Sequence, residues 1–196
     1  MRINISLDKK SIKSAIEQVK AVQKKIKTEL PKVYLQKCVA KIIEIANRNL
    51  AIVDIGSEAK TLIQTSWQIS PVIGNKITLS NNAEFEQGKN IAVFVEFGVG
   101  VVGKGQNHTL ASETNYQYNV PSYSKLWDKW YFTLEGGAER MNIESNYYES
   151  QNTKAGVMYG TKGSPATMFL YKAWKEFETS GLYKTLWEEA KAEVIG

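Results

Sequence analysis

Apolar side chains recur every three or four positions through the first quarter of the chain, which is the spacing of one helix face. One stripe predicts a helix from Asp8 to Leu30, on the residues Ile12, Ile16, Val19, Ile26 and Leu30. A second stripe predicts a helix over about 32–53, on the residues Val33, Cys38, Ile42, Ile45, Ala46, Leu50 and Val53. We expect Asp8 to cap the first helix, Pro31 to end it or open the second, and Gly56 to follow the second.

The pattern changes to short apolar runs from residue 62 onward. Runs on either side of Pro71 and Gly74 predict a β-hairpin with strands near 64–70 and 75–80. The almost wholly apolar segment 90–102, NIAVFVEFGVGVV, predicts a buried strand, although its periodicity leaves a short helix open.

The last third of the chain contains two strand-like segments and then a helical stripe. Residues 129–135 and 155–160 are rich in aromatic or β-branched side chains, which predicts a strand in each. After Pro165 the stripe falls on Phe169, Leu170, Ala173, Trp174 and Phe177. Gly181 interrupts it, so a final helix is expected over 182–195. We expect Trp67 and Phe169 to be anchors of the core.

Residues 101–155 differ from both flanks, being glycine-rich at the start, polar in the middle and dense in aromatics. A chain of 196 residues suits one domain, so we predict a single domain, 1–196, in which 101–155 is an insertion. Its aromatics fit a stacking face for sugar or single-stranded nucleic acid, a protein interface, or a small local core. The candidates are Tyr116, Tyr118, Tyr123, Trp127, Trp130, Tyr131, Tyr147 and Tyr148.

Charge is unevenly distributed along the chain. Residues 1–50 hold twelve Lys or Arg and four Asp or Glu, a balance of +8, whereas residues 51–196 hold thirteen and sixteen, a balance of −3. The basic part suits an acidic protein face, nucleic acid, or a simply solvated helix surface. The chain lacks both a run of ~18 apolar residues and the apolar core of a signal peptide. We therefore expect the protein inside a cell, or in a particle assembled there.

Few residues could carry catalysis or hold a metal. Cys38 and His108 are the only cysteine and histidine, so a zinc site built by one chain is excluded. Cys38 lies among apolar positions and is expected to be buried, whereas His108 lies in a polar segment and is expected at the surface. Glu135 and Glu139 are interpreted as solvated turn charges rather than as a pair of catalytic acids.

The glycines of 98–105 imitate two phosphate-binding patterns. Gly98, Gly100 and Gly103 form G-x-G-x-x-G, and Gly98 to Lys104 form G-x-x-x-x-G-K. Gly105 then stands where the second pattern needs Ser or Thr, and no helical period follows. We interpret the segment as a flexible glycine loop. The sequence therefore predicts no catalytic residue, no bound cofactor and no metal site.

Three segments in order carry a resemblance to a known family. They are LIQTSW at 62–67, AVFVEFGVG at 92–100 and GTKGSP at 160–165, the last followed by a helical segment. The chain resembles the head–tail joining (neck) or tail-component proteins of long-tailed bacteriophages and prophages, over residues 8–100 and 156–180. It departs from them at Val99, where the family usually has threonine, and in the length of 101–155.

The resemblance implies an α+β fold. N-terminal helices and a C-terminal helix pack on a small, mostly antiparallel sheet, with 101–155 as a long β-rich insertion and interface arm. It also implies a short helix over 91–97, in place of the strand, leading into a glycine turn. Its motif and interface candidates are Glu96, Phe97, Gly98, Gly100, Gly160, Thr161, Pro165 and Phe169. Since Glu96 lies in an apolar run, its carboxylate needs a partner, such as a lysine or backbone donors.

The function that the resemblance implies is non-enzymatic. The protein would be a virion structural protein that acts in head–tail joining or tail completion, found in the virion and, during assembly, in the host cytoplasm. It would form a homo-oligomeric ring and dock onto other head-completion and tail proteins, with genomic DNA as a passing partner and no membrane. The alternative is a binding module whose aromatic insertion contacts glycan or nucleic acid.

Overall fold

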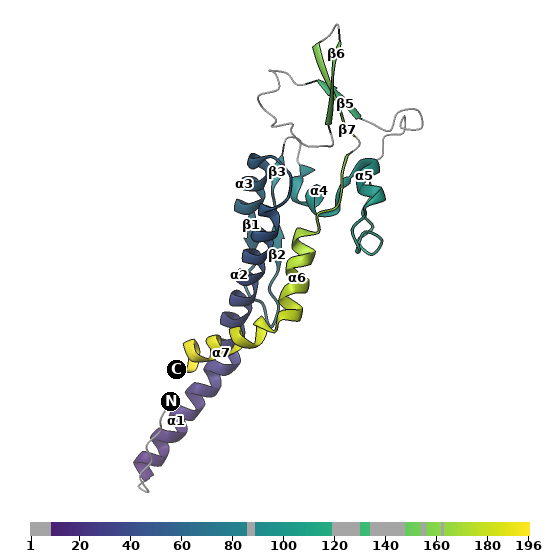
Figure 1. Ribbon diagram of the computed structural model, residues 1–196. Helices are drawn as coiled ribbons and strands as arrows, with labels where there is room; N and C mark the ends of the chain where they lie inside the picture. The colour runs from purple at the N-terminus through teal and green to yellow at the C-terminus, as the bar shows by residue number, and fades with distance from the viewer. Residues whose placement is uncertain (1–8, 86–88, 119–129, 134–147, 154–155, 162) are drawn as a thin grey trace. The chain divides into compact units, whose positions relative to one another are not determined.

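The computed structural model describes residues 9–85, 89–118, 130–133, 148–153, 156–161 and 163–196 (Figure 1). The chain divides into two compact units, each made of separate stretches of sequence. Unit 1 comprises Met1–Ile45, Ile69–Ser80 and Ala173–Gly196, and unit 2 comprises Ala46–Gln68 and Asn81–Lys172.

Two helices follow the two N-terminal apolar stripes. Helix α1 (Lys9–Thr28) and helix α2 (Leu30–Ala51) are separated by one residue, Glu29, whose carbonyl accepts a hydrogen bond from the Val33 amide. Pro31 is the second residue of α2, so it opens the second helix rather than ending the first. Both helices are confirmed, whereas Asp8 lies outside the described residues.

Unit 1 has a core between α2 and helix α7 (Leu182–Ile195). Leu30, Ala190 and Val194 are buried there, and Tyr34 meets Trp187 edge-on with ring centroids 5.2 Å apart. On the side of α7 that faces α1, the Lys25 ammonium donates a hydrogen bond to the Val194 carbonyl. These contacts explain how the amphipathic stripes of widely separated segments are buried together.

Two further expectations hold in unit 1. Cys38 is buried, and burial raises the pKa of its thiol. Helix α6 (Phe169–Ser180) ends before Gly181, which has a left-handed backbone with a φ of 74° and separates it from α7. The predicted interruption of the C-terminal helical stripe is therefore confirmed.

The predicted hairpin is present, but it begins later than expected. Strand β1 (Trp67–Ile69) pairs with strand β2 (Leu79–Asn81), and Gly74 has a φ of 61° in the turn between them. Helix α3 (Ser57–Thr65) occupies part of the predicted first strand, and Gly56 caps its start instead of ending α2. Sequence analysis missed α3 because Ile63 is its one buried residue, too few for a periodic stripe.

The strand predicted over 90–102 is wrong. After the short antiparallel pair β3 (Glu84–Phe85) and β4 (Lys89–Asn90), the chain forms helix α4 (Ile91–Phe97) and helix α5 (Gly100–Gly105). The Asn90 side chain caps α4 by accepting a hydrogen bond from the Ala92 amide. The helix over 91–97 that the resemblance implied is therefore confirmed.

A second antiparallel sheet in unit 2 has the order β5-β7-β6. Strands β5 (Trp130–Thr133) and β7 (Gly156–Thr161) confirm the two predicted strands, and β6 (Tyr148–Thr153) pairs with β7 on its other side. A two-residue strand, β8 (Gly163–Ser164), follows.

The α+β class is thus confirmed at the level of helices with small antiparallel sheets. A β-rich insertion spanning all of 101–155 is not what the chain forms, because its first residues belong to α5 and to turns up to Asn115.

Candidate functional site

Glu96 is a buried carboxylate that caps a helix from another part of the chain. It is 8% exposed, in the last turn of α4. One carboxylate oxygen accepts a hydrogen bond from the Leu170 amide and the other from the Tyr171 amide, both at 2.9 Å, in the first turn of α6. The first four amides of a helix have no partner within it, and the helix dipole favours an anion there. The expectation that Glu96 takes backbone donors is confirmed.

Backbone carbonyls of α4 also accept hydrogen bonds from the segment before α6. The Val95 carbonyl accepts hydrogen bonds from the Thr167 amide at 3.2 Å and from its hydroxyl at 2.8 Å. The Glu96 carbonyl accepts one from the Met168 amide at 3.1 Å. Carbonyls in the last turn of α4 therefore find donors in the two residues just before α6, and these carbonyls have no partner within α4.

His108 is the third partner of Glu96, and its predicted surface position is wrong. The imidazole is 2% exposed, and its Nε2 lies 3.0 Å from a Glu96 carboxylate oxygen. Its Nδ1 accepts a hydrogen bond from the Leu110 amide at 2.9 Å. Since Nδ1 is the acceptor, the proton is on Nε2, which donates to Glu96. The polar sequence around His108 predicted an exposed loop. In the structure this loop folds back, so that the His108 imidazole is buried against the Glu96 carboxylate.

Aromatic rings enclose this pair. Phe97 lies between the imidazole of His108 and the ring of Tyr116, with centroid distances of 4.4 and 4.7 Å. Tyr171 meets His108 edge-on at 5.3 Å, and Tyr118 meets Tyr116 edge-on at 5.0 Å. We call Glu96, Phe97, His108, Tyr116 and Tyr171 the Glu96 cluster.

Tyr116 and Tyr118 are therefore part of a local core. The Tyr116 hydroxyl donates to the Gly98 carbonyl at 2.8 Å, and the Tyr118 hydroxyl accepts from the His108 amide at 2.9 Å. Burial raises the pKa of Tyr116 to about 12. Of the three interpretations of the aromatics, the local core holds for Tyr116 and Tyr118.

Of the six remaining aromatic candidates, three lie outside the described residues and three lie on strands. Tyr123, Trp127 and Tyr147 lie outside the described residues. Trp130 and Tyr131 are on β5 and Tyr148 is on β6, and their backbones flank β7. Trp130 and Tyr148 both pair in register with Thr161, and Tyr131 pairs with Gly160.

The motif glycines provide close backbone contact, so the interpretation as a flexible loop is wrong. Antiparallel bridges join Val99 to Ser164 and Gly100 to Gly163. A Cβ added to Gly98 would lie 2.5 Å from the Ala166 nitrogen. One added to Gly163 would lie 2.0 Å from the Val99 carbonyl oxygen. Gly98 and Gly100 also have positive φ angles of 77° and 68°, which glycine adopts readily.

Phe169, the first residue of α6, is an anchor of unit 2 as predicted. It is 2% exposed, and the half-buried Trp67 meets it edge-on with ring centroids 6.4 Å apart. The Asn49 amide donates to the Phe169 carbonyl, and the Trp67 indole donates to the Asn47 side-chain oxygen. Sequence analysis missed both asparagines, since they lie on the polar positions of a helical stripe. Pro165, half-buried, precedes α6 as the resemblance implied.

The chemistry of the Glu96 cluster is that of a cap. A carboxylate that orients a histidine also occurs in nucleophilic catalysis, where the other imidazole nitrogen takes a proton from the nucleophile. Here that nitrogen, Nδ1, is occupied by the Leu110 amide, and the ring is buried. Glu96 already accepts three hydrogen bonds. The arrangement therefore joins segments and offers no open position for a substrate.

Among the described residues, no three His, Cys, Asp or Glu side chains gather as metal ligands. None of the helices in the described part of the chain has the length and apolar character to cross a bilayer. No protein-family model, no curated protein and no solved structure matches this chain.

Proposed function

We propose that the chain is a non-enzymatic virion structural protein that acts in head–tail joining or tail completion. It forms a homo-oligomeric ring and docks onto neighbouring head-completion and tail proteins, and genomic DNA passes through the ring. It resides at the head–tail junction or in the tail, and in the host cytoplasm during assembly.

One observation carries this proposal: two motif segments of the phage resemblance meet in space. The first is 96–100 and the second is 160–165, more than fifty residues later. Their backbones pair at Val99 with Ser164 and at Gly100 with Gly163. Because the glycines serve this approach and Glu96 caps α6, the motif residues build a joint rather than a reaction centre. A joint of this kind suits a structural component.

The closed Glu96 cluster gives further support. Both nitrogens of its imidazole are hydrogen-bonded within the chain, and its carboxylate accepts three hydrogen bonds from donors of the same chain. Buried Glu96 and His108 accept hydrogen bonds from backbone amides and so hold segments of the chain together, which suits a structural protein.

Strands β5 and β6 are the part of 101–155 that suits an interface arm. They pair with β7, which lies just outside that range, in the β5-β7-β6 sheet. Within the described chain, β5 and β6 are its outer strands, and an outer strand offers unpaired amides and carbonyls to a neighbouring subunit. The backbones of Trp130, Tyr131 and Tyr148 lie on these strands, and such residues are enriched at protein interfaces. Tyr116 and Tyr118 do not belong to the arm, because Tyr116 is in the Glu96 cluster and Tyr118 packs against it.

Immunogold labelling of purified particles tests the proposal directly. Antibodies to this chain are expected to label the neck or tail, and negative-stain images of the purified protein are expected to show rings. Particles from a strain lacking the gene are the control. Unlabelled particles, together with a monomer that binds a glycan array or single-stranded DNA, would favour the alternative of a binding module.

The arm has its own test. Replacing residues 119–153 by a short linker is expected to leave a folded chain that forms rings poorly, measured by circular dichroism and sedimentation. The replacement begins at 119 because a cut at 104 would remove His108 and Tyr116 from the Glu96 cluster. A shortened chain that still forms rings normally would refute the arm.

A further inference from the structure

Helix α1 carries a row of apolar side chains that α7 does not cover. The row comprises Ile12, Ile16, Val19 and Ile26, which are between 41% and 49% exposed. Alongside it runs a groove of about 370 Å³, lined by Ile12, Ala15, Ile16, Val19, Lys20 and Gln23. The contact of α1 with α7 lies on another side of the helix, where Val22 and Lys25 approach Ile195. We call the four apolar residues the α1 seam.

The spacing of the α1 seam is that of a coiled coil. The steps from Ile12 to Ile16 to Val19 are four and three residues, and the same steps lead through Gln23 to Ile26. This alternation repeats every seven residues and places one residue after another on a narrow line. Ile12, Val19 and Ile26 take heptad position d, and Ile16 and Gln23 take position a. Such a line packs against the matching line of a second helix, knob into hole.

Lysines follow one flank of the α1 seam. Position e, next to each d residue, is occupied by Lys13, Lys20 and Lys27, one in each heptad. The opposite flank, position g, carries Ala15 and Val22 within the helix. Residues at e and g face the partner helix and select it by charge. The three lysines therefore require acidic residues on whatever helix lies against the seam.

A second copy of α1 does not meet that requirement. In an antiparallel pair position e faces position e, so Lys20 would face another lysine of the same row. In a parallel pair position e faces position g, where Ala15 and Val22 offer no charge. The whole helix has seven lysines and one glutamate, so two copies also repel each other.

A bilayer surface fits the α1 seam less well than a helix does. Helices that lie in an interface have a broad apolar face, commonly with Trp, Phe or Leu. The α1 seam is a narrow line of isoleucine and valine, and α1 contains no aromatic residue. β-Branched residues at a and d suit helix pairing of the coiled-coil type.

We propose that the α1 seam is a docking surface for an amphipathic helix of another protein. This partner helix has an apolar line of the same seven-residue repeat, flanked by Glu or Asp that pair with Lys13, Lys20 and Lys27. The surface does not depend on the virion role, because α1 alone builds it.

A designed peptide tests this on the full chain. The probe is a fluorescein-labelled peptide of four heptads with Ile at a, Leu at d and Glu at e and g, and its twin has Lys at e and g. We expect saturable binding of the Glu peptide, measured by fluorescence anisotropy, and binding of the Lys peptide weaker by about tenfold or more. Equal binding of the two peptides, or binding of neither, would overturn the proposal.

Matched variants of α1 sharpen the test. Lys20→Glu borders the groove, whereas Lys24→Glu makes the same charge change at an exposed position on the outer side of the helix. Lys20→Glu is expected to weaken Glu-peptide binding several-fold and Lys24→Glu to leave it unchanged. Ile16→Ser is expected to abolish binding, with circular dichroism showing that the chain stays folded. Identical losses for the two lysine variants would contradict a docking surface.

Two other occupants of the α1 seam, a second copy of the chain and a membrane, would each give a different experimental result. Sedimentation that shows a dimer, lost in Ile16→Ser, without peptide would assign the α1 seam to a second copy. Binding to vesicles containing phosphatidylserine, abolished by Ile16→Ser when the Glu peptide does not bind, would assign it to a membrane. Either result replaces the helix partner.

Discussion

The Glu96 cluster and the α1 seam use their side chains in opposite ways. In the cluster the Glu96 carboxylate and both imidazole nitrogens of His108 have partners in the same chain, and no buried side-chain nitrogen or oxygen in the described residues lacks one. Along the α1 seam, apolar side chains are exposed and lysines flank them. A closed network of this kind fixes backbone segments, whereas an open apolar line has its partner outside the chain.

The largest expected loss comes from the buried ring next to the cluster. Phe169→Ala is expected to lower the free energy of unfolding by about 3–5 kcal/mol, because it removes a fully buried aromatic side chain. Chemical denaturation followed by circular dichroism measures this change. Ile16→Ala on the exposed α1 seam is the control, and equal losses at the two positions would erase the distinction between them.

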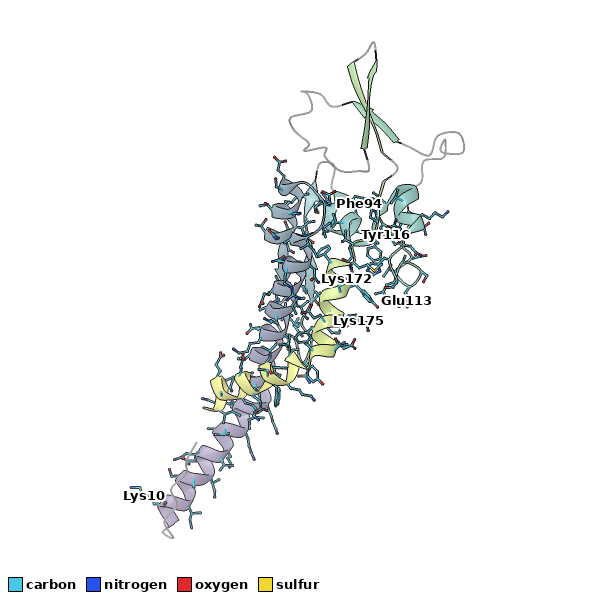
Figure 2. All side chains as sticks on the ribbon, in the orientation of Figure 1. Lys10, Phe94, Glu113, Tyr116, Lys172 and Lys175 are labelled. Atoms are coloured by element: carbon cyan, nitrogen blue, oxygen red, sulfur yellow. The ribbon has the colours of Figure 1, made fainter. Side chains whose placement is uncertain are left out.

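Removing the carboxylate of the cluster is the next largest change. Glu96→Ala leaves the Leu170 and Tyr171 amides and the His108 imidazole without their acceptor, at a cost of about 3 kcal/mol. Glu113, exposed in the turn before Tyr116, supplies the control Glu113→Ala, which is expected to change stability by less than ~0.5 kcal/mol (Figure 2). Thermal and urea melts that do not separate the two variants would mean that Glu96 is no cap.

High pH is expected to weaken both units through half-buried tyrosines. Burial raises the pKa of Tyr116 in unit 2 and of Tyr34 in unit 1 from 10.0 to about 12. The folded chain then keeps a proton that the unfolded chain has lost, so stability falls as the pH rises from about 10 to about 12. Urea melts at pH 9 and pH 11 should show this fall, and a smaller fall in Tyr116→Phe. If Tyr116→Phe loses as much stability between pH 9 and pH 11 as the unchanged chain, a group other than Tyr116 causes the loss.

The smallest expected change is on the α1 seam itself. Val19→Ser and Lys20→Glu are expected to alter the free energy of unfolding by less than about 1 kcal/mol, because both side chains are exposed in the chain alone. The same variants are expected to weaken binding of the Glu peptide several-fold or more. A large loss of stability in Val19→Ser would show that the chain covers this face by itself.

Local periodicity is enough for the long helices and for several strands. The stripes of α1, α2, α6 and α7, the hairpin around Gly74, and strands β5 and β7 all follow from the order of apolar and polar residues. In a strand every second side chain lies on the same face, and in a helix every third or fourth does, so a short stretch of sequence is enough to show the pattern. The segment 91–97 shows the limit of this rule. An all-apolar run has no period, and the asparagine cap and the glycine turn decide that it is helical.

The Glu96 cluster depends on contacts that no local pattern contains. The sequence shows that a carboxylate in an apolar run needs donors, but it does not show that they come from Leu170, Tyr171 and His108. Those groups lie 12 to 75 positions away and meet only when α4, the loop after α5 and the start of α6 are packed together. Burial then gives a polar loop histidine one fixed tautomer, because each buried nitrogen must find a partner.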